Sequence, residues 1–146
     1  MNVAIRRTSA VALHPTGVRV RIDSDRDIIA ARHQARALAH EAGFSLADLA
    51  IIATAISELG QNALRYARSG DLDIEIILDH GRRGIVIVAS DQGPGIPDVE
   101  LALRDGYSTS GSLGLGLPGV RRLMDDFSIT SEMGRGTTVT VKKWSG

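Results

Sequence analysis

Hydrophobic and polar residues alternate in several short stretches of the chain. Residues 18–22 have the sequence Val-Arg-Val-Arg-Ile, whose period of two predicts a half-buried strand, and residues 3–13 hold a further strand candidate. The segments Asp-His-Gly-Arg-Arg-Gly at 79–84 and Met-Gly-Arg-Gly at 133–136 each separate two strand-like stretches and predict antiparallel hairpins. The four stretches that they join are 72–78, 85–89, 128–131 and 137–142.

The segment after Ser24 has the apolar spacing of an amphipathic helix. Ser24 and Asp27 predict a cap at its N-terminus, because a serine oxygen can accept a hydrogen bond from an N–H group of the first turn. Gly43 predicts the end of the helix. The apolar positions on the predicted buried face are Ile28, Ala31, Ala35, Leu38 and Ala42.

A longer helix is predicted to follow directly, capped by Ser45 with Asp48 three residues on, and to end near Ala67. A third helix is predicted over residues 118–127, with Pro118 in its first turn. The expected order of elements is β-αα-ββ-α-ββ. Strands in hairpins with helices between them predict an α+β fold: a two-layer sandwich with one mixed, mostly antiparallel sheet and helices on one face.

Composition narrows the class of protein. The 146 residues, 43% of them hydrophobic, predict a single domain over residues 1–146. Seventeen Lys and Arg balance seventeen Asp and Glu, so we expect neither nucleic acid nor a membrane surface as partner. No signal peptide or membrane span is recognisable and cysteine is absent, which favours the cytoplasm. The four histidines have no ligand spacing, so no histidine metal site is expected.

Glu58 and Asn62 lie four residues apart in the second predicted helix, on one face and about one 5.4 Å turn apart. The carboxylate could accept a proton from an attacking hydroxyl, and the amide oxygen could complete the shell of a hydrated magnesium ion. Taken alone, such a pair more often consists of two solvated surface groups. Gly60 between them should destabilise the helix by about 1 kcal/mol relative to alanine. A close approach of the glycine-rich loop described below would explain it.

Asp91 follows an apolar strand candidate and begins the segment Asp-Gln-Gly-Pro-Gly-Ile-Pro. A carboxylate at the end of a strand can accept a hydrogen bond from an exocyclic amino group such as that of adenine. Gly93 and Gly95 would let the chain turn closely against a planar ring. An ordinary Asp/Gly/Pro turn has the same composition, so this segment alone leaves both interpretations open.

Residues 111–117, Gly-Ser-Leu-Gly-Leu-Gly-Leu, lead into the third predicted helix. Backbone N–H groups at a helix N-terminus, preceded by flexible glycines, bind phosphate well. The segment lacks the Lys-Ser/Thr pair of a P-loop and does not connect a parallel βαβ unit. The alternative is a mobile loop whose leucines pack on the core.

The order of these motifs, followed by Gly-Arg-Gly-Thr before the last strand, resembles the GHKL ATPase superfamily over residues 16–146. The resemblance implies a Bergerat fold that holds ATP between a helical layer and the sheet. It places magnesium on Asn62, the adenine amino group on Asp91 and a water-mediated adenine contact on Thr137. The other ATP-binding positions that it implies are Gly93, Gly95, Ile96, Gly111, Ser112, Gly114, Leu115 and Gly116.

The chain shows no dimerisation or transducer region like those of the larger members, which leaves the small, single-domain branch of that superfamily. Within this branch it resembles the anti-sigma-factor serine kinases of the RsbT type in the segments 55–67, 91–98 and above all 105–137. This resemblance implies a cytoplasmic serine/threonine kinase that phosphorylates a STAS-domain antagonist in a stress-response partner switch. Once released, the kinase would activate a PP2C-type phosphatase. Glu58 matches the general-base position. A partner-sequestering ATP-binding module without catalysis and an ATPase without a protein substrate are the alternatives, and a homodimer is possible.

Overall fold

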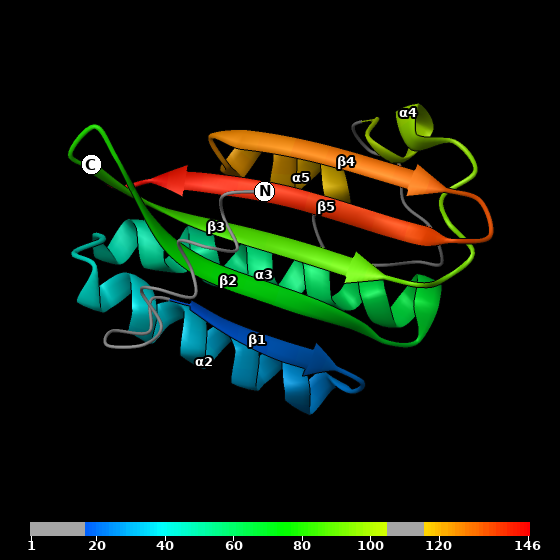
Figure 1. Ribbon diagram of the computed structural model, residues 1–146, viewed down its shortest axis with the longest axis horizontal. Coiled ribbons are helices and arrows are strands. Elements are labelled where there is room, and N and C mark those ends of the chain that lie inside the picture. Colours follow the sequence, from blue (N-terminus) through cyan, green and yellow to red (C-terminus); the bar gives the residue numbers. More distant parts are fainter. Residues whose placement is uncertain (1–16, 105–115) are drawn as a thin grey trace.

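The computed structural model describes residues 17–104 and 116–146. Its five strands form one sheet in the order β1-β2-β3-β5-β4 (Figure 1). The α+β sandwich is confirmed, but the expectation of a mixed sheet is wrong for the described residues, because all four strand pairs are antiparallel. The strands are β1 (Gly17–Ile22), β2 (Gly70–Asp79), β3 (Arg82–Asp91), β4 (Asp126–Glu132) and β5 (Gly136–Trp144).

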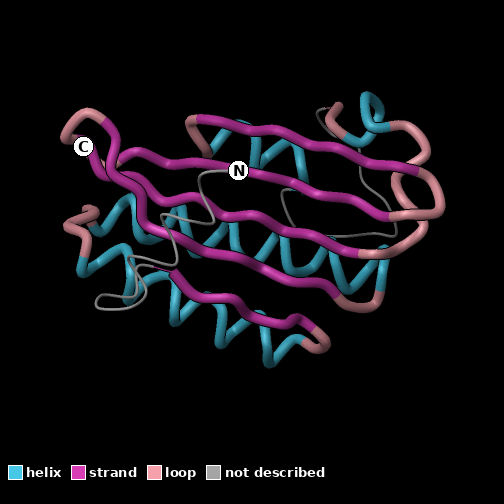
Figure 2. Tube along the Cα trace, viewed as in Figure 1, coloured by secondary structure: helices cyan, strands magenta, loops and turns pink. Residues whose placement is uncertain are grey.

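Of the four helices within the described residues, three cover one face of this sheet, and a short one lies near an end of β4 (Figures 1 and 2). Within the part of the chain that the structure describes, none of them combines the length and apolar character needed to cross a membrane. The covering helices are α2 (Asp25–Glu41), α3 (Leu46–Ala67) and α5 (Gly116–Leu123), and the short one is α4 (Val99–Ala102).

The core lies between the sheet and these helices. Alternate residues of β2, β3 and β5 point toward the helices and are buried, as the period of two predicts. Burial of each large aliphatic side chain contributes about 1.5–3 kcal/mol. The largest fully buried side chains are Ile22, Ile52, Ile56, Leu59, Leu72, Ile74, Ile85, Ile87, Val120 and Val141.

The helix ends agree with the sequence prediction in part. The Ser45 side chain accepts a hydrogen bond from the Asp48 N–H group (3.1 Å), so the predicted cap of α3 is confirmed. Ser24 is the N-cap residue of α2, as predicted, but its side chain makes no capping hydrogen bond, and Asp27 accepts instead from the Asp23 N–H group. Gly43 follows α2 at φ 90°, a left-handed conformation that suits glycine.

The two hairpins form as predicted, with longer strands. His80 and Gly81 both have positive φ, 51° and 78°, as in the tight type I′ turn that matches strand twist. The third helix is shorter than predicted and ends at Leu123, because Asp126 and Phe127 pair with β5. The strand candidate at 3–13 lies outside the described residues.

Gly60 is buried where α3 packs on α2. A Cβ atom there would lie 2.8 Å from Cγ1 and 3.1 Å from Cδ1 of Ile28, closer than carbon atoms normally approach. The close neighbour of Gly60 among the described residues is therefore α2, while the expected approach of the glycine-rich loop concerns residues that lie largely outside the described part of the chain. This contact places the N-terminal half of α2 beside the turn of α3 that carries Glu58 and Asn62.

Candidate nucleotide-binding site

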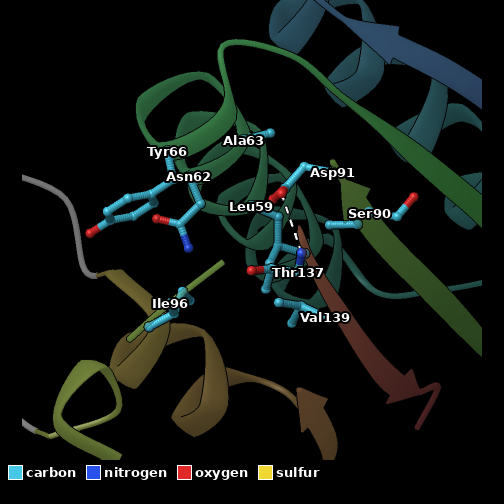
Figure 3. Close-up of a pocket in the computed structure, with 10 residues that line it drawn as sticks. Leu59, Asn62, Ala63, Tyr66, Ser90, Asp91, Ile96, Thr137 and Val139 are labelled. Atoms are coloured by element: carbon cyan, nitrogen blue, oxygen red, sulfur yellow. Dashed lines mark hydrogen bonds between the residues drawn. The ribbon is translucent and has the colours of Figure 1, made fainter. Parts of the chain in front are cut away.

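A pocket opens between α3 and the ends of β3 and β5 (Figure 3). Its wall is mostly apolar, and its polar side chains come from two sides: Asn62 and Tyr66 on α3, and Asp91 and Thr137 across from them. Such a chamber, with few polar groups, is typical of a small-molecule site. The remaining lining residues are Leu59, Ala63, Ala89, Ser90, Ile96 and Val139.

Asp91 is the last residue of β3, and its carboxylate is held by backbone groups. Oδ1 accepts hydrogen bonds from the N–H groups of Gly93 (2.9 Å) and Thr137 (3.3 Å). Oδ2 accepts no hydrogen bond from the described residues and is not sealed from solvent. One oxygen therefore orients the group, while the other is free to accept a proton donor on a ligand.

The segment after Asp91 is fixed by the β4–β5 hairpin. Ser131 Oγ accepts a hydrogen bond from the Ile96 N–H group (2.7 Å) and lies 2.9 Å from the Thr137 hydroxyl oxygen. The Gly134 N–H group donates to the Pro94 carbonyl (2.9 Å). These bonds give the pocket a preformed wall at the end of the sheet, where the chain would otherwise be a free turn.

Three glycines allow this close packing. A Cβ atom at Gly93 would lie 2.6 Å from that of Ala67, and one at Gly95, which has φ 87°, would lie 2.7 Å from the Glu132 carbonyl oxygen. At Gly136 (φ 129°) a Cβ atom would collide with the Asp91 carbonyl. The protein's own packing thus requires these glycines, in addition to any approach of a ring.

Asn62 lines the pocket, and Glu58 lies one turn before it on the same face of α3. The Asn62 amide lines the pocket and makes no hydrogen bond with the described residues. Glu58 Oε1 accepts a hydrogen bond from the Gly116 N–H group (2.9 Å), the first residue of α5. A carboxylate is favourable at a helix N-terminus, where backbone N–H groups lack helical partners.

The structure brings together most of the predicted site residues that it describes. Asn62, Asp91, Ile96 and Thr137 line one pocket, with Gly93 and Gly95 in the loop beside it. Glu58 and Gly116 are in direct contact next to the Asn62 turn. The remaining predicted positions, Gly111, Ser112, Gly114 and Leu115, lie outside the described residues.

Several pocket residues were not predicted from the sequence. Leu59, Ala63 and Tyr66 line the pocket on α3 together with Asn62, and their spacing of i, i+4, i+7 is a helical stripe that the periodicity could have revealed. Ser131 and its bonds to the neighbouring loop have no such local signal, because strand pairing alone brings the segments together.

The donors present suit a nucleotide with a magnesium ion. The apolar walls and the free Asp91 oxygen match a flat ring with an amino group, as in adenine. Among the described residues, no group of three His, Cys, Asp or Glu side chains could hold a metal ion. A magnesium ion here would therefore take one amide oxygen from Asn62 and the rest of its shell from phosphates and water, as magnesium often does with nucleotides.

Comparison with known proteins identifies the class of this fold and site. A family model described as a histidine kinase-like ATPase domain matches residues 23–143. The serine/threonine-protein kinase RsbT of Bacillus subtilis is 53% identical over 125 residues, which are 86% of this chain and 94% of that protein. The anti-sigma F factor of Geobacillus stearothermophilus is 32% identical over 66% of this chain and 69% of that protein.

Solved structures share the fold. The RsbU and RsbW domains of a Mycobacterium tuberculosis protein align with a TM-score of 0.59 and 22% identity, over 89% of this chain and 33% of that one. The SiaB–SiaC complex of Pseudomonas aeruginosa contains a chain that aligns with a TM-score of 0.55 and 12% identity, over 99% and 98%. The chain belongs to the histidine kinase-like ATPase family and, within it, to the serine/threonine protein kinases of the RsbT type.

Proposed function

We propose that this protein transfers the γ-phosphate of ATP to a serine or threonine of a STAS-domain antagonist in the cytoplasm. The observation that carries the proposal is that Asn62 lines a pocket whose opposite side holds Asp91, while Glu58 lies one turn before Asn62 on the same face of α3. A passive nucleotide binder needs the pocket but has no use for a carboxylate beside it. The 53% identity to the kinase RsbT supports a catalytic function for this protein over passive nucleotide binding.

In the proposed complex the adenine ring lies against the apolar pocket wall. Asp91 Oδ2 accepts a hydrogen bond from the ring's amino group, while Oδ1 keeps its two backbone donors. Thr137 supports the same end of the ring through water, since its hydroxyl is already positioned by Ser131. The selectivity for adenine thus comes from a carboxylate whose orientation is set before the nucleotide binds.

At the other end of the pocket, Asn62 offers its amide oxygen to the magnesium ion that accompanies the phosphates. Bound magnesium neutralises charge that develops on the phosphates during transfer. Asn62 therefore fixes where the phosphates lie relative to Glu58. The neutral amide suits this task because it binds the ion without adding negative charge next to the phosphates.

Glu58 is the proposed general base. As the acceptor hydroxyl oxygen bonds to the γ-phosphorus and the bond to the ADP oxygen breaks, the hydroxyl proton passes to the Glu58 carboxylate. In the structure this carboxylate is held by the Gly116 N–H group. We infer that the N-terminus of α5 accepts a phosphate oxygen when ATP binds, because such termini favour phosphate, and that Glu58 is then released toward the hydroxyl.

The proposed setting is a partner switch in which residues 1–146 act as one domain. The kinase phosphorylates the STAS-domain antagonist, leaves it, and then binds and activates a PP2C-type phosphatase. The anti-sigma F factors among its relatives support this setting, since they belong to the same family. A homodimer stays a prediction from the family resemblance.

Replacing Glu58 with Gln tests the proposal, because the amide keeps the size of the side chain but cannot take up the proton. We expect Glu58→Gln to retain ATP binding, measured by calorimetry, and to lose phosphate transfer to the STAS protein by at least about a hundredfold. Glu41→Gln, the same change at the exposed end of α2, is the matched control. Undiminished transfer by Glu58→Gln would remove its role as base.

A further inference from the structure

One flank of α2 combines unpaired arginines with an exposed apolar side chain. Arg32 and Arg36 are exposed, and neither makes an ion pair or hydrogen bond with the described residues. Ile29 lies next to them and is 48% exposed. With 100° of rotation per residue, the three positions fall on a single stripe (i, i+3, i+7), which we name the α2 flank.

The α2 flank lies on the exposed side of α2 that borders α3. Asp25 lies on the same stripe, one turn before Ile29, and its carboxylate accepts a hydrogen bond from the Gln61 side chain of α3 (3.3 Å). One turn beyond Gln61, Arg65 is also exposed and makes no ion pair with the described residues. The α2 flank and Arg65 therefore border a common outer surface of the two helices.

This surface lies beside the proposed catalytic turn. Gln61 is one residue from Asn62 and three from Glu58, and the contact of Gly60 with Ile28 holds the two helices close together. Packed helices are about 8–10 Å apart, so a protein bound on the α2 flank spans one helix width to reach Glu58. An acceptor hydroxyl could therefore approach the base from a partner held on this surface.

We propose that the α2 flank, together with Arg65, is the docking surface for an acidic patch on the phosphate-acceptor protein. This inference rests on the proposed function. Arg32 and Arg36 beside the exposed Ile29 match the composition of protein interfaces, which are enriched in arginine around apolar anchors. Neither Arg32 nor Arg36 forms an ion pair with a described residue, and Asp25, the carboxylate on the stripe, lies about two helical turns before Arg32. A partner rich in Asp and Glu supplies the missing counter-charges.

The test reverses the charge of the α2 flank. We expect Arg32→Glu/Arg36→Glu to weaken binding of the STAS-domain protein encoded beside this gene by at least about tenfold, with ATP affinity unchanged. Binding is measured by calorimetry at two salt concentrations, and the variant should also lose salt dependence. Ile29→Ala should weaken binding without changing the salt dependence.

The matched control is Arg19→Glu/Arg82→Glu, which makes the same change in net charge at β1 and at the start of β3. Urea unfolding checks that both variants fold. STAS-protein binding by Arg32→Glu/Arg36→Glu equal to that of the control would overturn the docking surface. Failure of the proposed function gives a different result, since the wild-type protein would then bind the STAS protein without transferring phosphate to it.

Discussion

Asp91 shows how one carboxylate acquires two separate tasks from its surroundings. Its Oδ1 oxygen is committed to the backbone donors of Gly93 and Thr137, while Oδ2 is left to the pocket. The side chain cannot turn to follow a different ligand without giving up both bonds. The orientation of the proposed acceptor for the adenine amino group is therefore set by the fold before any ligand arrives.

Asp91→Asn should lower ATP affinity by about ten- to a hundredfold, equivalent to ~1.4–2.7 kcal/mol. The Asn oxygen would keep the two backbone donors, so its NH₂ group would face the amino group of adenine, and two donors would oppose each other. Nucleotide binding is measured by calorimetry for ATP and GTP, with Asp73→Asn on β2 as the control. An unchanged preference for ATP over GTP would show that Asp91 does not recognise the ring.

Asn62→Ala should reduce nucleotide affinity only when magnesium is present, by about tenfold or ~1.4 kcal/mol. The amide oxygen is the proposed protein ligand of the ion, and its removal leaves the apolar contacts of the ring in place. Binding of ADP is compared in magnesium and in EDTA, with Gln61→Ala, the neighbouring exposed amide, as the control. Equal losses of affinity under both conditions would contradict a role in metal binding.

Two contacts between elements place these side chains. The β4–β5 hairpin braces the segment after Asp91 through Ser131 and Gly134, and α2 packs against α3 at Gly60. The first contact shapes the proposed adenine end of the pocket, and the second fixes α3 relative to α2. Each joins segments far apart in the sequence, so the geometry of the site depends on the packing of the whole sheet and helix layer.

Gly60→Ala should lower the free energy of unfolding by about 1–2 kcal/mol, although alanine is the better helix former. The added methyl group would meet Ile28 Cγ1 at 2.8 Å in a closely packed contact. The sign of the effect should reverse in an Ile28→Ala background, where space is available and helix propensity dominates. Urea unfolding of the four proteins in this cycle measures the coupling, and a stabilising effect of Gly60→Ala in the wild-type background would exclude the steric explanation.

Elements with a long repeating pattern could be predicted from the sequence, because their apolar spacing reports directly which face is buried. The two long helices are of this kind. The Ser45 cap and both hairpins could also be predicted, because a capping residue or a short turn segment marks each of them locally. Prediction failed where a tertiary partner decides the outcome. The predicted third helix included residues 125–127. Instead, the Asp125 N–H group donates to the Lys142 carbonyl oxygen, and the chain continues as strand β4. Helix α4 is too short to leave a periodic signal.

The same distinction holds for the site. Asn62, Asp91 and Thr137 could be predicted because each belongs to a motif of fixed spacing. The bond between Glu58 and Gly116 could not, since it joins α3 to a helix 58 positions later in the chain. Sequence spacing therefore predicted residues that line one pocket, while the contacts of these residues in the free protein depend on the packing of distant elements.

The whole molecule separates its tasks in space. The nucleotide pocket lies at one end of the sheet, where β3 ends and β4 turns into β5, and the helices cover one face (Figure 1). The proposed docking surface lies on the outer side of the helical layer, next to the α3 turn that lines the pocket. A partner can therefore reach the proposed base from outside without displacing the adenine end of the nucleotide.

The most direct measurement is transfer of the γ-phosphate of labelled ATP by the purified protein, with magnesium and the STAS-domain protein encoded beside it. We predict label on a serine or threonine of the STAS protein, located by mass spectrometry, with one ADP formed for each phosphate transferred. Glu58→Gln should leave the STAS protein unlabelled. A wild-type protein that binds both ATP and the STAS protein but transfers no phosphate would contradict the kinase function and identify a passive binding module.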